Sequence, residues 1–295
     1  MKFIQCKTTL FLILFFQFTS HTFCKNHHTD FWYYKEKINN GSVFELNLDD
    51  LKNKLLLAPN ASEKKPSDIV LFMPTSEGKK ISFRFYQNTV IHPNLAKKYP
   101  NIKTYVGIGL ENPTHRATVV LNGDKIIGSV DSNLKPSHFK SFNVQDRING
   151  IVVYNETIRN EETFCKTKNS VLETNREFPE CMGTDDPCYP AGTELVTYRF
   201  AAMVTEAVTN DAADGTIEGG LTWLVGSVAY VNSLYVRDVS FQLQIVEDND
   251  ELIFTDNNPA PDIFNQDCGD GWATLGCELG VVDSVLDARI GSGGW

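Results

Sequence analysis

The sequence has no histidine after His138 and no lysine after Lys168, although it runs to Trp295. Imidazole is the commonest side-chain metal ligand in proteins. The sequence downstream of His138 therefore excludes a histidine-based zinc centre. All six histidines lie in the N-terminal half, at His21, His27, His28, His92, His115 and His138.

Long apolar runs are also scarce. The run LFLILFFQF, Leu10–Phe18, is too short to span a bilayer and follows a lysine near the N-terminus. Small and polar residues come next, so residues 1–24 are typical of a secretory signal peptide. No other stretch is long and apolar enough to cross a membrane. We therefore expect a secreted, extracellular protein with no membrane partner after signal cleavage.

The missing lysines make the charge distribution uneven. From Cys181 onward there are 19 acidic residues against three arginines, a formal charge of −16, whereas the whole chain carries −10. One interpretation is a solvated acidic surface beside an ordinary basic region. The other is that the basic N-terminal half covers the acidic C-terminal half. The lysines form no stripe with interleaved aromatic residues, so we expect no nucleic-acid partner.

Cysteines are few but suit an exported protein, where disulfides persist. Removal of residues 1–24 would leave five of the seven cysteines, an odd number that leaves one thiol without an intramolecular bond. The candidate disulfide cysteines are Cys181, Cys188, Cys268 and Cys277, which would leave Cys165 free. The pairing among the four does not follow from the sequence.

Residues 25–175 have mostly β character, and we predict one β-rich domain. Ile81–Tyr86 alternates apolar and polar residues, and Gly150–Tyr154 is a short apolar run. Ala117–Val130 predicts a hairpin with Asn122-Gly123 in a type I′ turn. Residues 41–57 begin extended and then show helical spacing, and residues 93–109 form a turn that leads into a strand. A polar, Pro-containing composition break over residues 163–192 predicts a linker at 176–196.

From residue 197 the apolar periodicity changes. Thr197–Val204 and Val239–Val246 are expected strands, and Leu252–Thr255 a short third one. Between the first two, Thr216 can cap a long helix whose apolar residues recur every three or four positions. Strand, helix and strand in this order predict a parallel βαβ unit. A second helix is expected at Val281–Ile290, stopped by Gly291. The expected fold class is α+β/α/β: a β-rich domain, then an incomplete mixed sheet with two helices.

Several segments resemble the opening half of the catalytic domain of reprolysin-type zinc metalloendopeptidases, within the metzincins. They are the entry strand TYRFAAM, the helix and strand VNSLYVRDVSFQLQIV, the segment LIFTD and the helix VVDSVLDARIGS. The N-terminal part, with LAKKYPNIKTYVGIG and the hairpin, resembles the propeptide of those enzymes. The resemblance implies a β-rich prodomain over residues 25–175 and the N-terminal part of a metallopeptidase domain over 197–295.

Zinc in this family is held by the motif H-E-x-x-H-x-x-G-x-x-H, whose glutamate takes a proton from metal-bound water. This sequence lacks the motif, so we predict no catalytic residue, no metal ligand and no bound cofactor in this chain, although the full-length family uses zinc. Cys165 stands where a propeptide could present an inhibitory thiolate to zinc. Alternatively it is a disulfide partner or an inert cysteine.

Two functions follow. One is a secreted metalloendopeptidase zymogen, truncated before the zinc motif, whose full-length form would act on proteins or peptides. The alternative is a non-catalytic exported binding or protease-inhibitory protein. An acidic cluster could suggest Ca²⁺, but its spacing matches no known calcium loop and we expect a solvated turn. Its members are Glu247, Asp248, Asp250, Glu251 and Asp256. Trp223 and Trp272 are expected to be packing residues.

Overall fold

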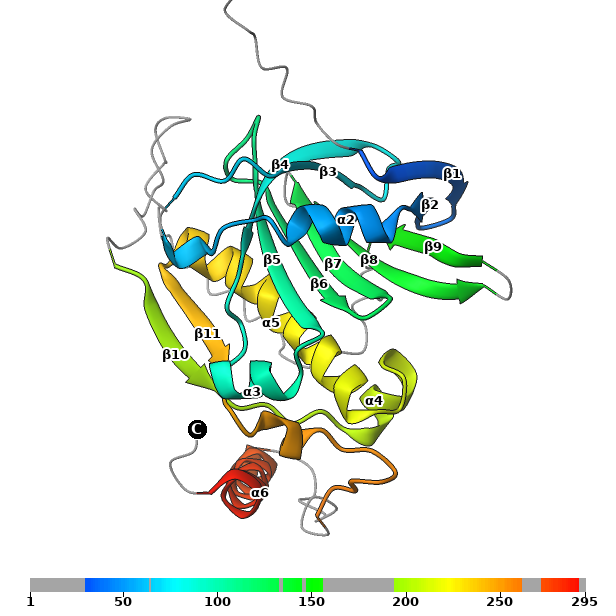
Figure 1. Ribbon diagram of the computed structural model, residues 1–295. Coiled ribbons are helices and arrows are strands. Elements are labelled where there is room, and N and C mark those ends of the chain that lie inside the picture. The colour runs from blue at the N-terminus through cyan, green and yellow to red at the C-terminus, as the bar shows by residue number, and fades with distance from the viewer. Residues whose placement is uncertain are drawn as a thin grey trace, which may run out of the picture.

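The computed structural model describes residues 30–63, 65–132, 135–144, 147–155, 194–261 and 272–291. It is a mixed α/β fold dominated by a curled antiparallel β-sheet (Figure 1). The predicted signal peptide and most of the predicted linker lie outside the described residues.

Nine strands form the large sheet, in the spatial order β1-β2-β9-β8-β7-β6-β5-β4-β3. They are β1 Trp32–Ile38, β2 Gly41–Leu46, β3 Val70–Pro74, β4 Lys80–Gln87, β5 Ile102–Gly109, β6 Arg116–Asn122, β7 Lys125–Ser132, β8 Lys135–Val144 and β9 Arg147–Tyr154. Every pair of neighbours is antiparallel. The sheet curls until β1 contacts β3 at its other end. Lys80 ties these ends together by donating to the backbone carbonyl of Trp32 and, at 2.6 Å, to the Asp30 carboxylate.

Strands β6 and β7 form the hairpin that the sequence predicts, but its turn is shifted by one residue. Asn122 pairs with Lys125, so Gly123 and Asp124 are the central residues. Of these two, Gly123 has a positive φ of 55° and Asp124 does not. Glycine with positive φ at the first central position is the pattern of a type II′ turn, so the type I′ prediction is wrong.

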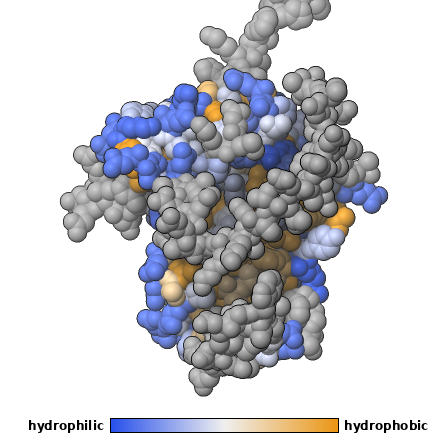
Figure 2. Space-filling view, turned by 180° about the vertical axis from the view of Figure 1, so that it is seen from behind, coloured by the Kyte–Doolittle hydropathy of each residue, from blue (hydrophilic) through white to orange (hydrophobic). Residues whose placement is uncertain are grey.

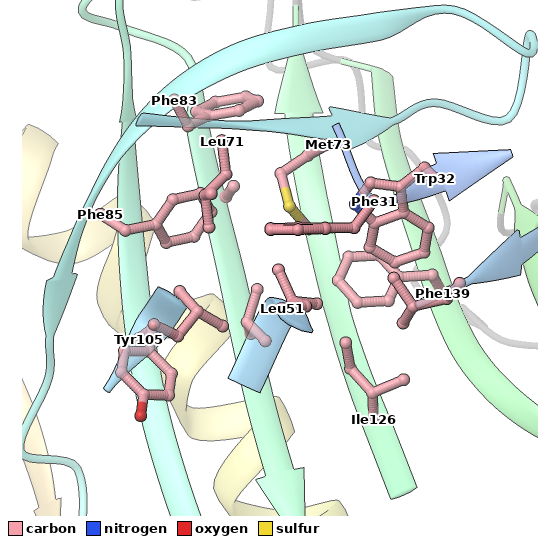
Figure 3. Close-up of a cluster of buried hydrophobic side chains, with 14 of the residues drawn as sticks. Phe31, Trp32, Leu51, Leu71, Met73, Phe83, Phe85, Tyr105, Ile126 and Phe139 are labelled. Carbon is pink, nitrogen blue, oxygen red and sulfur yellow. The ribbon is translucent and has the colours of Figure 1, made fainter. Parts of the chain in front are cut away.

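One face of the sheet holds an aromatic core beneath helix α2, Leu48–Leu55 (Figure 3). Leu51 and Leu55 of α2 are fully buried among strand side chains. Trp32 packs edge-on against Phe139, with ring centroids 5.6 Å apart. This core accounts for the alternation in the strands, because successive residues of a strand point to opposite faces.

The C-terminal part contains the predicted parallel βαβ unit. Strand β10, Val196–Phe200, pairs in parallel with β11, Phe241–Ile245, and helix α5, Ile217–Asp238, connects them. Thr216 caps α5 as predicted, since its hydroxyl accepts a 2.9 Å hydrogen bond from the backbone N–H of Gly219. Glycine at 291, with φ 77°, follows the last helix as expected.

Four details of the C-terminal part differ from prediction. Strand β10 ends at Phe200, before the predicted Val204. Leu252–Thr255 forms no strand. Its first residue ends the 3₁₀ turn η2, Asn249–Leu252, and among the described residues the rest makes only isolated bridges, Ile253 with Val204 and Thr255 with Asn258. The last helix, α6, spans Trp272–Ile290 and so begins well before the predicted Val281. A third helix, α4 at Glu206–Ala212, is capped by Thr205 and was not predicted.

Helix α5 lies across the other face of the large sheet, against β5, β6 and β7 (Figure 1). A second hydrophobic core forms there from both parts of the chain. Val90, Ile102 and Val120 come from the N-terminal half, and Leu221 and Val225 come from α5. Small residues allow the close approach: a Cβ on Gly226 would lie 2.6 Å from the Cδ1 atom of Ile127.

Strand β11 is also bordered by the N-terminal half. The backbone N–H of Ile245 donates to the carbonyl of Val90, and the N–H of His92 donates to the carbonyl of Ile245, both at 2.8 Å. Residues 90–92 thus run parallel to β11 along the edge that β10 leaves open. The short helix α3, Pro93–Lys98, follows at once and was predicted only as a turn.

Candidate functional site

The candidate site is the interface between α3 and the acidic turn Glu247–Glu251, which follows β11. Asp250 belongs to the C-terminal part and is 4% exposed. Its Oδ2 atom accepts a 2.9 Å hydrogen bond from the Tyr99 hydroxyl and an ion pair from Lys98. Nearby, the side-chain amide of Asn94 donates to Glu247 at 2.7 Å. The predicted solvated turn is therefore wrong for Asp250, which the N-terminal half covers.

Electrostatics favour this contact. The hydrogen bond to Asp250 raises the pKa of Lys98 above its ordinary value, so the ammonium stays charged. Burial raises the pKa of Tyr99, and its hydrogen bond to Asp250 raises it further, so the phenol stays a donor. Asp250 Oδ1 is buried and accepts no hydrogen bond from the described residues. A buried carboxylate with one unsatisfied oxygen depends strongly on the donors that remain.

A second polar contact lies at the N-terminus of α5. Asp214 precedes the helix and receives Lys125, the first residue of β7, as an ion-pair partner. Burial alone would raise the pKa of Asp214, but hydrogen bonds from Lys125 and Thr216 outweigh it and lower this pKa. The amide of Asn122 adds a 2.9 Å hydrogen bond to the Thr222 hydroxyl of α5.

The C-terminal end of α5 reverses the polarity of these contacts. Arg237 donates to the buried Asp131 of β7 at 3.3 Å and to the carbonyl oxygen of Thr114 at 3.0 Å. It also bonds the neighbouring Asp238 at 2.6 Å, a contact that raises the pKa of Arg237 and lowers that of Asp238. In the pairs Lys98–Asp250 and Lys125–Asp214, the N-terminal half therefore supplies the basic residue and the C-terminal part the acidic one. In the pair Asp131–Arg237 these roles are exchanged.

Two buried asparagines hold the C-terminal part together internally. The Asn232 side chain accepts from the backbone N–H of Leu243 and donates to its carbonyl, both at 2.8 Å, and so ties α5 to β11. Asn249 does the same for Ala202, at 2.9 and 3.0 Å. Neither asparagine was predicted from the sequence to be important. The sequence feature that could have identified Asn232 is its position as a single amide within the apolar stripe of the helix.

The structure does not describe the side chains of the cysteines singled out for chemistry. Cys165, Cys181, Cys188 and Cys268 lie outside the described residues, and so does the side chain of Cys277, which falls in α6. Among the described side chains, no three His, Cys, Asp or Glu groups are placed to hold a metal ion. Trp223 is 36% exposed, and the side chain of Trp272 is not among those described.

Comparison of the chain with models of known protein families, with curated proteins and with solved structures finds no match in any of the three. Within the described part of the chain, none of the helices has the length and apolar character needed to cross a membrane.

Proposed function

We propose that this chain is the precursor part of a secreted zinc metalloendopeptidase. Residues 25–175 would be a prosegment, and residues 197–295 would be the N-terminal part of a metzincin-like catalytic domain. The proposal is supported by one observation above all: the α5–β11 unit has its main hydrophobic core in common with the β-rich half. In the ion pairs Lys98–Asp250 and Lys125–Asp214, the lysine comes from the N-terminal half and the aspartate from the C-terminal part. The charge distribution of the sequence suggests the same arrangement for a basic prosegment that covers an acidic domain.

The residues present do not fit a catalytic zinc ion, because no histidine follows His138 and the required motif is absent. No step of peptide hydrolysis is therefore assigned to this chain. Its proposed role is conformational: the sheet supplies the surface on which α5 buries its apolar stripe, and residues 90–92 pair with β11. The other edge of β10 pairs with no described strand, and β10 carries the exposed Val196 and Tyr198. An open edge with exposed apolar residues is suited to pairing with a further strand.

The folding role is tested by splitting the chain. Two specific protease sites in the predicted linker, one after residue 175 and one after residue 193, would give fragments 25–175 and 194–295, which are then separated in urea. We expect fragment 194–295 to show no cooperative unfolding alone and to regain it when fragment 25–175 is added. Cooperative unfolding of 194–295 alone, with an unchanged midpoint, would contradict the prosegment role.

Charge variants of the added fragment sharpen this experiment. Lys98→Glu with Lys125→Glu should raise the fragment concentration needed for half-recovery, because both substitutions place like charges opposite Asp250 and Asp214. The matched control is Lys97→Glu with Lys103→Glu, which makes the same change in net charge at exposed positions. Equal effects of the two pairs would show that only net charge matters.

The enzymatic assignment has its own test in the gene. The reading frame beyond the codon for Trp295 should encode H-E-x-x-H-x-x-G-x-x-H within the same domain. Unrelated sequence there would favour the second candidate, a non-catalytic exported binding protein. A cavity at the interface is the observation that favours that candidate.

A further inference from the structure

This cavity has a volume of about 590 Å³ and lies between the C-terminal half of α5 and the strands β4, β5 and β6. Val236 and Ser233 line it from α5, and Val106, Ile108 and Arg116 line it from the sheet. Lys65, from the loop before β3, stands at its rim. Its size is within the range of about 300–1,000 Å³ that is usual for small-molecule sites.

The charge of the lining has one sign. Lys65 and Arg116 contribute to it, and none of the described residues that line the cavity is an aspartate or a glutamate, although Lys65 pairs with Glu63 beside the lining at 3.2 Å. This is unexpected for a chain with 37 acidic and 27 basic residues. A concave surface with cations and no carboxylate favours an anion and disfavours a cation.

Arg116 is the better placed of the two cations. Its Nη1 atom donates to the backbone carbonyls of Pro113 and, at 3.0 Å, His115, which orient the guanidinium without neutralising it. The nearby carboxylates of Asp131 and Asp238 both bond Arg237 instead. Burial, and then the charge of Arg237, lower the pKa of Arg116. An anion beside Arg116 would offset both effects, and arginine stays protonated in proteins.

The rest of the lining supplies apolar contact. Val106 and Ile108 are half-buried on the face of β5 that α5 covers further along, and Val236 is 39% exposed. Figure 2 views the molecule from the side of α5 and shows hydrophobic residues gathered on this face. A ligand with an apolar body would remove these side chains from water.

We propose that this cavity binds a small amphipathic carboxylate, with its carboxylate on Arg116 and its apolar body against Val106, Ile108 and Val236. A single carboxylate matches the charge of one half-buried guanidinium and can accept two parallel hydrogen bonds from it. A phosphate dianion would need a second cation to balance its charge, and the other lining cation, Lys65, already pairs with Glu63. The inference does not rest on the protease-precursor proposal.

Isothermal titration calorimetry of the full chain tests the ligand class, with octanoate as the probe. We expect octanoate to bind at least about tenfold more tightly than octan-1-ol or octylammonium, because only octanoate pairs with Arg116. Acetate should bind more weakly still, since it lacks the apolar body. Octanoate binding no tighter than octan-1-ol would overturn the proposal, and octyl phosphate binding more tightly than octanoate would overturn its choice of headgroup.

Variants locate the site. Val236→Glu places a carboxylate opposite Arg116 and should weaken octanoate binding by about tenfold or more relative to Val236→Gln, which has the same shape and loses the same apolar contact but carries no charge. Arg116→Gln should match Val236→Glu, and Lys97→Gln, on α3, should bind like the wild type. Thermal unfolding checks that each variant folds. If Arg116→Gln does not fold, the Val236 pair decides: equal octanoate affinity for Glu and Gln would overturn the site.

Discussion

At the scale of single residues, the buried polar side chains are more informative than the apolar ones. Asn232, Asn249 and Asp250 lie between apolar neighbours, and each bonds a different segment of the chain. A buried polar group is costly unless it is hydrogen-bonded, so each of these residues favours one arrangement of its neighbours over others.

Asn232→Ala should lower the free energy of unfolding by about 1–3 kcal/mol, because the backbone N–H and carbonyl of Leu243 both lose their side-chain partner. Urea unfolding monitored by circular dichroism measures this loss. Ser227→Ala, at a half-buried position of the same helix whose hydroxyl donates to the carbonyl of Trp223, should change stability by less than about 0.5 kcal/mol. Equal losses in the two variants would show that the Asn232 bonds contribute nothing specific.

Asp214 should make stability depend on pH in the acidic range. Its folded-state pKa is lowered, so the unfolded chain takes up the proton more readily. The stability from this carboxylate is therefore complete above its unfolded pKa of about 3.9, and it is lost as the pH falls through the folded value. Asp214→Asn should lose less stability between pH 6 and pH 3 than the wild type in urea titrations. Asp283→Asn, at an exposed position of α6, is the control and should follow the wild-type curve.

At the scale of elements, the sequence predicted those whose signals are local. The alternation of Ile81–Tyr86 and the capping by Thr216 depend on neighbouring residues, and both predictions are confirmed. The parallel pairing of β10 and β11 was also predicted correctly, because two strands joined by a helical crossover in one sheet run in the same direction. Leu252–Thr255 was wrong because a strand depends on a partner that the sequence does not display.

The site was less predictable than the fold. Charge asymmetry suggested that the two halves cover one another, but nothing local pairs Lys98 with Asp250, which lie far apart in the sequence. Val106 and Ile108 read only as alternate residues of a strand. Their place in a cavity depends on how α5 crosses the sheet, which is a property of the packed molecule.

Glycine substitutions test how closely α5 packs against the sheet. Gly280→Ala in α6 should stabilise the protein by about 0.5–1 kcal/mol, because a Cβ there meets nothing within 4 Å and alanine is the better helix former. The same change at Gly226 of α5 should give no gain, because its Cβ would press on Ile127. Chemical unfolding of both variants measures the difference, and equal gains would mean that α5 does not approach the sheet so closely.

At the scale of the whole molecule, the shared core joins the β-rich half and the βαβ unit into one cooperative structure. Val90 and Val120 on one side and Leu221 and Val225 on the other are fully buried in it. Domains that share so much buried apolar surface are expected to unfold together rather than in turn.

Tryptophan reporters test this cooperativity. With Trp272 and Trp295 replaced by phenylalanine, Trp32→Phe leaves Trp223 on α5 as the reporter, and Trp223→Phe leaves Trp32 in the sheet core. In each variant, we expect the fluorescence transition in urea to have the same midpoint as the circular dichroism transition of that variant. The comparison within one variant removes the effect of the substitution on overall stability. A Trp223 transition that precedes the circular dichroism transition would show that the βαβ unit unfolds separately.

The packing of α5 against the large sheet also has a consequence for the order of folding during synthesis. Every strand of the large sheet precedes α5 in the chain, so the sheet can close before the helix leaves the ribosome. A circular permutant that begins at residue 194 and ends at 175 would reverse this order. It would expose the apolar stripe of α5 while no sheet yet existed to receive it, and it should aggregate during expression even though its final contacts are the same.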